Sequence, residues 1–423
     1  MIDTDNLTKY LTDAFAMASR DGRIEMMGFF AGMEKEFAAA GYREETGGVK
    51  SVLIVRLDVV GDSIITTGFV REVRRNYPKA HITFVVSPLV KPLVEFCPYV
   101  NDVLAFEAHF NPAGLISMIA ECANFARNSL WQRHYDVAFC PQWGSENISG
   151  LFTAYFSGAR ERIGFGHYPI HAWMGNPPPN IAAVDEKLLT KNIITTREQV
   201  SEAEKAFYVL TAAGFKVEDT SMELWFNSAD AISAKNFIKN IAPDRLKIVL
   251  GLGAGDNSRK YPAEQWIEAL KEIAKDNVHF IIIGGKSESE DARTAAKNLP
   301  ADKITDLTGK TTLRETAALI AAADMYMGND TGVMHMACAA KRKVIVIYRE
   351  AKDKETDKPG LLSEYRRFPP WQNNAEVLRP EHALDECAEN HGRYGGCVRH
   401  EAHCIKSVPP EEIVAAYRRL INR

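Results

Sequence analysis

The chain has 423 residues, more than the roughly 250–300 at which single hydrophobic cores stop growing, so two domains are expected. Its 46% hydrophobic and 25% charged residues are typical of a globular protein. The formal net charge of −4 excludes a global basic field, so we expect no nucleic-acid partner.

The sequence carries no export or membrane-spanning signal. No apolar stretch approaches the ~18–20 residues of a spanning helix, and the acidic, amphipathic N-terminus lacks the features of a secretory signal. Seven Cys in such a chain do not predict a disulfide framework. We therefore expect a cytoplasmic protein. A peripheral contact with the inner membrane is left open, and the lack of a basic face argues against it.

Residues 1–48 are expected to form a helical extension. Apolar residues between Leu7 and Phe15 recur at helical spacing, a second apolar cluster spans residues 26–33, and Gly47 and Gly48 end the pattern. A helical pair packed on the main body is the first interpretation. Contact with a membrane or a partner is the alternative.

Residues 49–240 are expected to form a Rossmann-like domain, because short apolar runs alternate with helical stretches. Residues 164–180 and 226–243 are predicted to be a loop and the passage into a second domain. The expected strands are 51–55, 82–86, 103–105 and 137–139, and the expected helices are 64–76 and 202–213.

The same alternation restarts at Lys247, so residues 241–385 are expected to form a second Rossmann-like domain. Residues 386–423 are expected to be a Cys/His-rich loop and a C-terminal helix, 410–421. We therefore predict an α/β fold with two facing Rossmann-like domains and parallel sheets, in which ligands bind beyond the carboxyl ends of the strands. The expected strands of the second domain are 247–250, 278–283, 325–327 and 344–347, and its helices are 262–274 and 313–323.

Gly61 and Asp62 follow the first strand and open a helix. This places Asp62 at the carboxyl edge of the first sheet, where a carboxylate could take a proton from a hydroxyl group. Asp is also a favourable helix N-cap, so the spacing alone leaves a structural role open. Asp58 is the next candidate for the same proton.

Residues 251–262 join the first strand of the second half to its helix. Their glycines free backbone N–H groups to approach phosphate, and Arg259 or Lys260 adds positive charge. The stretch has no Walker ending and fits the dinucleotide fingerprint poorly, which disfavours a nicotinamide dehydrogenase. A flexible surface loop is the alternative.

A third motif joins the strand that ends near Gly328 to a new helix. The N–H groups of Thr331 and Gly332 would face an anion, aided by the helix dipole. Asp330 could cap the helix, or it could orient a sugar or a nearby cation. His335 lies one turn into the helix, where a lone His more often has a structural role.

Glu288 follows the strand at 278–283 after two glycines. A carboxylate just beyond a Rossmann-type strand can hold ribose hydroxyls. Acidic residues are also common in the first turn of a helix, so this motif is weak by itself.

The C-terminal region gathers six residues of metal-binding types. It contains no Cys-x-x-Cys pair, and the spacings match no zinc pattern, so we assign no metal and keep metal binding as the alternative to a structural role. These residues are Cys387, His391, Cys397, His400, His403 and Cys404.

Taken in order, four stretches resemble the family 9 glycosyltransferases, whose best-known members are the lipopolysaccharide heptosyltransferases. The resemblance runs from about Ser51 to the C-terminus. It implies a GT-B fold, with acceptor recognition by the first domain, nucleotide-sugar binding by the second, and inverting chemistry without a metal or other cofactor. The matching stretches are residues 55–62, 157–165, 253–266 and 330–337.

The resemblance implies roles for the residues that match. Asp62 matches the proposed general base. Arg259 matches a basic residue, usually Lys, that contacts the donor phosphate, and Lys260 beside it could do the same. Glu288 matches the acid that binds the donor nucleoside.

In the third motif the resemblance implies that Asp330 contacts the donor sugar. Thr331 and Gly332 would supply N–H groups that bind phosphate, and His335 would belong to the same site.

This chain also departs from the family. Ala254 and Gly255 stand where some members carry threonines, which leaves the donor open. A protein-glycosylating branch holds iron with four C-terminal cysteines, whereas this tail offers three, so that iron is not carried over.

We predict an inverting, metal-independent glycosyltransferase. Its partners would be a nucleotide-sugar donor, with ADP-heptose as the first candidate, and a lipid-linked or glycan acceptor such as the lipopolysaccharide core or a related glycan or protein. A sugar-nucleotide epimerase-hydrolase of GT-B shape is one alternative, and it would need additional catalytic carboxylates. A non-catalytic sugar-nucleotide-binding protein is the other.

Overall fold

The computed structural model describes most of the chain. The expected helix at Leu7–Phe15 and most of the loop at 164–180 lie outside the described residues, as do Cys387, His391, Cys397 and His400. The described residues are 23–42, 44, 47–107, 115–143, 148–166, 187–194, 201–354, 364–384, 401 and 403–422.

The chain divides into two compact units. The first comprises Met1–Val59 and Gly68–Thr220, and the second comprises Val60–Thr67 and Ser221–Arg423. The short segment that contains Asp62 therefore belongs, by its contacts, with the second unit.

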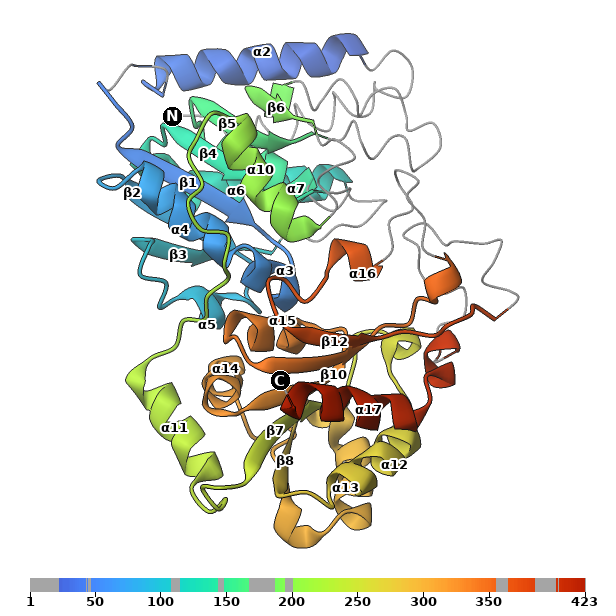
Figure 1. The fold of residues 1–423 in the computed structure, drawn as a ribbon. Coiled ribbons are helices and arrows are strands. Elements are labelled where there is room, and N and C mark those ends of the chain that lie inside the picture. Colours follow the sequence, from blue (N-terminus) through green and yellow to red (C-terminus); the bar gives the residue numbers. More distant parts are fainter. Residues whose placement is uncertain are drawn as a thin grey trace. The chain divides into compact units, whose positions relative to one another are not determined.

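A six-stranded parallel sheet forms the centre of the first unit, in the order β3-β2-β1-β4-β5-β6 (Figure 1). This is the strand order of the Rossmann fold, whose ligand crevice lies beyond the carboxyl ends of β1 and β4, where the order reverses. The strands are β1 (Ser51–Arg56), β2 (His81–Val86), β3 (Asp102–Ala105), β4 (Val137–Cys140), β5 (Glu161–Phe165) and β6 (Lys191–Ile193).

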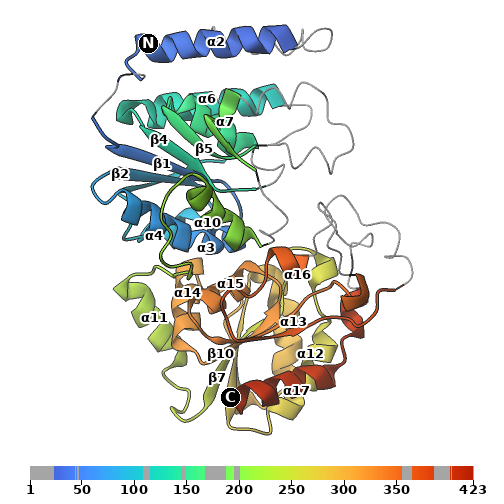
Figure 2. The same ribbon diagram turned by 45° about the horizontal axis from the view of Figure 1, so that its top comes forward.

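Helices cover both faces of this sheet (Figure 2). On one face α6 (Leu115–Ser129) and α7 (Ile148–Phe156) share a core with α2 (Arg23–Ala39), which contributes the buried Phe30, Met33 and Phe37. On the other face lie α4 (Thr67–Asn76) and α10 (Glu202–Ala212). The described part of the N-terminal extension is therefore a helix packed on the first unit.

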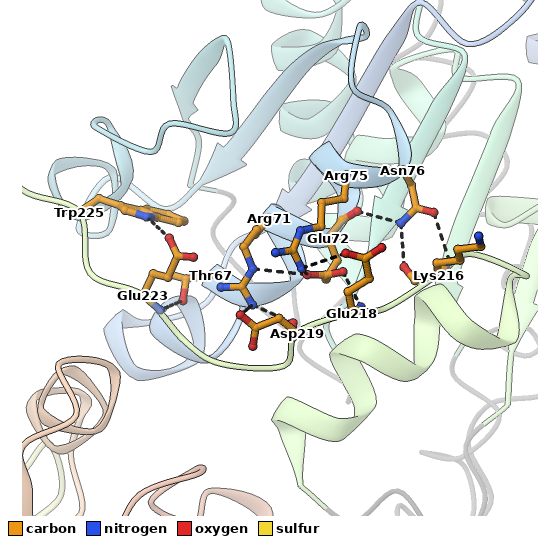
Figure 3. A network of polar contacts seen from close by, with 10 residues as sticks. All are labelled: Thr67, Arg71, Glu72, Arg75, Asn76, Lys216, Glu218, Asp219, Glu223 and Trp225. Atoms are coloured by element: carbon orange, nitrogen blue, oxygen red, sulfur yellow. Dashed lines mark hydrogen bonds and ion pairs between the residues drawn. The ribbon is translucent and has the colours of Figure 1, made fainter.

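The chain leaves α10 along α4, held by a polar network (Figure 3). Within the first unit, buried Glu72 accepts from Arg75 at 2.5 Å and from the Glu218 backbone N–H at 2.8 Å. Within the second unit, the Glu223 backbone N–H donates to Thr67 Oγ1 at 2.9 Å. On each side of the boundary between Thr220 and Ser221, the chain therefore makes hydrogen bonds within a single unit.

The second unit repeats the strand order. Its six parallel strands lie in the order β12-β11-β10-β7-β8-β9. Taken from β9 to β12, this is the strand order of the first sheet, so the order reverses between β7 and β10. The strands are β7 (Leu246–Gly251), β8 (Val278–Ile283), β9 (Ile304–Asp306), β10 (Met325–Asn329), β11 (Lys343–Ile347) and β12 (Ala375–Leu378).

Helices also pack on the second sheet, and the core beneath it includes residues of α12 and α17. None of the described helices has both the length and the apolar character needed to cross a membrane. The helices of this unit include α3 (Val60–Ile65), α11 (Ser228–Ile238), α12 (Ala263–Ile273), α13 (Ser289–Asn298), α14 (Leu313–Ala322), α15 (Gly332–Ala339), α16 (Glu364–Arg367) and α17 (Pro410–Ile421).

The predicted α/β class with two parallel sheets is confirmed, and the differences are local. The helix expected at 64–76 is two helices, α3 and α4, separated by Thr66, whose hydroxyl donates to the Asp62 carbonyl at 2.8 Å. The passage expected at 226–243 contains α11, which begins with a capping box made by Asn227 and Asp230. Strands β5, β6, β9 and β12 are not among the expected strands, because each is short and contains polar residues that interrupt an apolar run.

Candidate active site

The carboxyl edge of the second sheet brings the sequence motifs together. β7 and β10 lie side by side, with Met325 opposite Ile248, so the segments that follow both strands meet at the switch point. We call residues 252–261, which follow β7, the donor loop, after the role that the family resemblance implies for them. The start of α15 follows β10.

Asn329, which the sequence motifs did not single out, holds the donor loop. Its fully buried side chain donates from Nδ2 to the carbonyls of Leu252 and Gly253, each at 3.0 Å. Its Oδ1 accepts from the Tyr261 backbone N–H at 3.1 Å. One amide group therefore satisfies backbone groups at both ends of the loop and fixes the loop to β10.

Arg259 and Lys260, which the sequence alone does not distinguish, have different partners in the structure. Arg259 Nη1 lies 3.7 Å from Asp330 Oδ2, so this guanidinium is directed toward the start of α15. Lys260 Nζ lies 2.5 Å from Asp291 Oδ2 on α13. Arg259 is consequently the better placed of the two to meet an anion at α15.

Glu288 lies against the donor loop, on a short turn after β8. A Cβ atom built on Gly253 would lie 2.5 Å from Glu288 Cγ, which is closer than real contacts allow. Gly253 is therefore required for Glu288 to approach the loop. The carboxylate also accepts from the Ser287 hydroxyl at 2.6 Å.

Asp330 is buried, and its surroundings disfavour the ionised form. The pKa of Asp330 is raised to about 7, with burial as the largest cause; the charges of Glu364 and Glu350 also raise it, whereas those of Arg259 and Arg349 lower it. Near neutral pH this carboxyl group therefore exists in both protonation states. A protonated Asp330 can lie beside an anion without electrostatic repulsion.

The first turn of α15 provides N–H donors. Thr331 is extended, with φ −150°, and the Met334 N–H donates to the Thr331 carbonyl at 3.0 Å. The amides that precede Met334 have no acceptor within the helix, because the first turn of any helix lacks one. A Cβ on Gly332 would lie 2.9 Å from the Gly61 nitrogen, so α3 packs directly on this turn.

Asp62 is the third residue of α3 and is half-buried. It lies inside the first turn of the helix and not at the N-cap position that the structural interpretation required. A Cβ on its neighbour Gly61 would lie 3.2 Å from His335 Cδ2 and 3.3 Å from Gly332 Cα. The turn that carries Asp62 is therefore held against α15 by the close approach of two glycines.

His335 fills the space between α15 and α3. Its side chain is buried, and burial lowers its pKa to about 4, so the imidazole is neutral at physiological pH. Nδ1 finds no hydrogen-bond partner among the described residues. In this structure His335 thus packs against α3 and carries no positive charge near neutral pH.

Of the six C-terminal Cys and His residues, two are described. His403 and Cys404 are buried, with Nδ1 and Sγ 3.6 Å apart. Within the described ranges, no group of three or more His, Cys, Asp or Glu residues is arranged to hold a metal ion.

The fold is that of the GT-B glycosyltransferases. The chain is similar to the structure of a family 9 glycosyl transferase from Veillonella parvula, with a TM-score of 0.67 at 18% identity over 88% of this chain and 97% of that one. It is also similar to Escherichia coli ADP-heptose LPS heptosyltransferase II, with a TM-score of 0.64 at 18% identity over 88% and 98%. A third similar structure is E. coli heptosyltransferase WaaC with ADP, with a TM-score of 0.56 at 15% identity over 88% and 97%.

The family follows from the sequence. The model described as glycosyltransferase family 9 (heptosyltransferase) matches residues 184–395, half of the chain, and the protein belongs to this family of enzymes. Lipopolysaccharide heptosyltransferase 2 of E. coli K12 is 21% identical over 338 residues, which cover 78% of this chain and 87% of the relative. Lipooligosaccharide heptosyltransferase 2 of Campylobacter jejuni is 23% identical over 236 residues, or 52% and 69%. The resemblance predicted from four motifs is confirmed at the level of the family.

Proposed function

We propose that this enzyme transfers heptose from ADP-heptose to a hydroxyl group of a lipopolysaccharide core or a related glycan acceptor, with inversion at the anomeric carbon. The observation that carries the proposal is the edge of the second sheet, where Arg259, Asp330 and the first turn of α15 converge. The curated relatives are named for heptose transfer, and one similar structure was solved with ADP.

The donor diphosphate is expected to lie at the first turn of α15. The amides of Thr331 and Gly332 would donate to phosphate oxygens, and the Arg259 guanidinium would neutralise the charge that develops on the leaving group. Such preorganised donors act most strongly when the leaving group departs as an anion, so we expect no metal requirement. Glu288, beyond β8, is placed for the ribose hydroxyls of the nucleoside.

Asp62 is our candidate for the general base. In a direct displacement the acceptor oxygen forms a bond to the anomeric carbon as the bond to the diphosphate breaks, and ADP departs. The proton of the acceptor hydroxyl passes to the Asp62 carboxylate. A half-buried carboxylate on a turn that is fixed against α15 suits this role.

The experiment is an assay of ADP release with purified protein, ADP-heptose and a heptose-deficient lipooligosaccharide acceptor, in the presence of EDTA. We expect release that requires the acceptor and continues with EDTA, and a product whose anomeric configuration is opposite to that of the donor by NMR. Release without acceptor would indicate a hydrolase, and binding without release would indicate a non-catalytic protein. Loss of activity with EDTA, restored by Mg²⁺, would contradict the metal-independent mechanism.

A further inference from the structure

Arg349 is a buried cation at the edge of the second sheet that the proposed mechanism does not use. It follows β11, on the strand next to the one that leads to Asp330. Its side chain is only 8% exposed, and a guanidinium so far removed from water requires acceptors.

Two separate segments supply those acceptors. On the donor loop, Arg349 Nη1 lies 3.4 Å from Asp256 Oδ2 and donates to the Ser258 hydroxyl. On α16, Glu364 Oε1 accepts from Arg349 Nη2 at 2.5 Å. The planar fork of a guanidinium can bond several acceptors in fixed directions, which a lysine ammonium cannot do.

The loop residues that Arg349 contacts also shape the turn that carries Arg259. Asp256 accepts from the Ser258 backbone N–H at 2.8 Å, and the short helical turn Asn257–Arg259 follows. Burial alone would raise the pKa of Asp256, but the bonds from Ser258 and the charge of Arg349 lower it below its usual value. The ionised Asp256 is therefore part of the same arrangement.

We propose that Arg349 is a positioning residue of the donor site, which clamps the donor loop to α16 and so holds Arg259 toward Asp330. The proposal rests on the donor site proposed above. It assigns to α16, which carries none of the sequence motifs, a part in the affinity for the nucleoside diphosphate.

The first test measures the clamp in the unliganded, full-length protein. In Arg349→Lys we expect faster hydrogen exchange of backbone amides in residues 256–260. Arg342→Lys is the matched control, since Arg342 precedes the same strand and its guanidinium donates to the carbonyls of Ala340 and Ala323, away from the donor loop. The control should leave exchange in the donor loop unchanged. Equal exchange in wild type and Arg349→Lys would overturn the proposal, whatever the enzyme transfers.

The second test measures the consequence for the ligand, with ADP as the probe in calorimetric titration. Arg349→Lys should weaken ADP about tenfold or more, the loss expected for a charge-assisted hydrogen bond, and Arg342→Lys should not. Ser258→Ala removes one contact of the clamp with little risk to folding, and its effect should not add to that of Arg349→Lys. Additive effects of the two changes would contradict a shared clamp.

The kinetic test separates positioning from general stability. Where transfer is measurable, the donor KM should rise in Arg349→Lys while the acceptor KM stays within about twofold of wild type, since a merely structural loss would change both. If ADP does not bind the wild-type protein, the proposed function fails, and the hydrogen-exchange comparison still decides whether Arg349 holds the loop.

Discussion

The two sheets share one strand order but differ in what lies at the switch point. At the carboxyl edge of the first sheet, which we call the first edge, the Asp58 carboxylate has two close partners. Arg56 Nε lies 2.8 Å from it, and the Gln142 side chain donates a hydrogen bond to it. At the carboxyl edge of the second sheet, the second edge, Arg259 Nη1 lies 3.7 Å from Asp330 Oδ2, which is a long ion pair. This pair lies beside the backbone amides at the start of α15. One topology can thus carry either a neutralised structural network or a set of donors poised for an anion.

The largest expected effects come from two carboxylates that follow β1: Asp62 on α3, which packs against α15, and Asp58 beside Arg56. Asp62→Asn should retain the fold and ADP affinity and lose ~10²–10⁴-fold in turnover, because a general base is removed. Turnover with donor and acceptor is the measurement, with melting temperature and ADP titration as controls. Asp58→Asn is the matched variant, and it should mainly lower the melting temperature, because it removes a charged partner of buried Arg56.

If Asp62→Asn keeps more than about a third of wild-type turnover, a loss far short of that expected for a general base, Asp62 is structural. The search for the base would then move to Asp58.

Asn329→Ala tests whether the Asn329 side chain fixes the donor loop at the second edge. The change removes three hydrogen bonds to the donor loop and leaves two carbonyls and one N–H without that partner. Each unsatisfied buried group costs ~1–3 kcal/mol, so we expect lower unfolding free energy in urea and at least about tenfold weaker ADP binding. Wild-type ADP affinity in this variant would show that the loop geometry does not depend on Asn329.

The two neighbouring cations offer a smaller and more specific contrast. Arg259→Met should weaken ADP binding by ~1.5–3 kcal/mol, the usual cost of a lost charge-assisted hydrogen bond. Lys260→Met should have the lesser effect, because Lys260 is engaged by Asp291. Calorimetric titration of both variants checks the order, and a larger loss in Lys260→Met would reverse our assignment.

The smallest expected effect is the dependence of donor affinity on pH. Burial raises the pKa of Asp330 from 3.8 to about 7. A bound diphosphate favours the protonated carboxyl and raises the pKa further, so binding takes up a proton once the pH exceeds about 7. Donor affinity should therefore fall as pH rises through this value, by at most about tenfold per pH unit.

An ADP-sugar whose diphosphate does not titrate in this range is the suitable probe, followed by calorimetry between pH 6 and pH 8.5, values chosen to bracket the pKa of about 7. Asp330→Asn imitates the protonated state and should flatten the dependence. A flat profile in the wild type, or an unchanged slope in Asp330→Asn, would show that Asp330 does not titrate with the donor.

The parts of the site that could be predicted from sequence are those that lie at strand ends. Gly61, Asp62, Arg259 and Asp330 follow apolar runs, and parallel strands bring their carboxyl ends to one edge, so local patterns sufficed. The family resemblance then gave these residues roles.

The residues that hold the donor loop in place could not be predicted in this way, because their hydrogen-bond partners are distant in the sequence. Asn329 bonds backbone atoms more than 60 residues away, and Arg349 meets Ser258 across 91 positions, with no local spacing to mark either pair. The neutral state of His335 and the raised pKa of Asp330 follow from burial, which a single motif does not reveal. Sequence patterns thus indicated the residues proposed to meet the ligand, and the structure was needed to find what holds them.

The second edge, and not the first, is proposed to be the nucleotide site, and hydrogen exchange with and without ADP distinguishes the two. We predict that ADP protects backbone amides in the donor loop and in residues 330–335, and leaves residues 56–58 and 140–143 unchanged. Protection confined to residues 56–58 and 140–143 would place the nucleotide at the first sheet and contradict the proposed donor site.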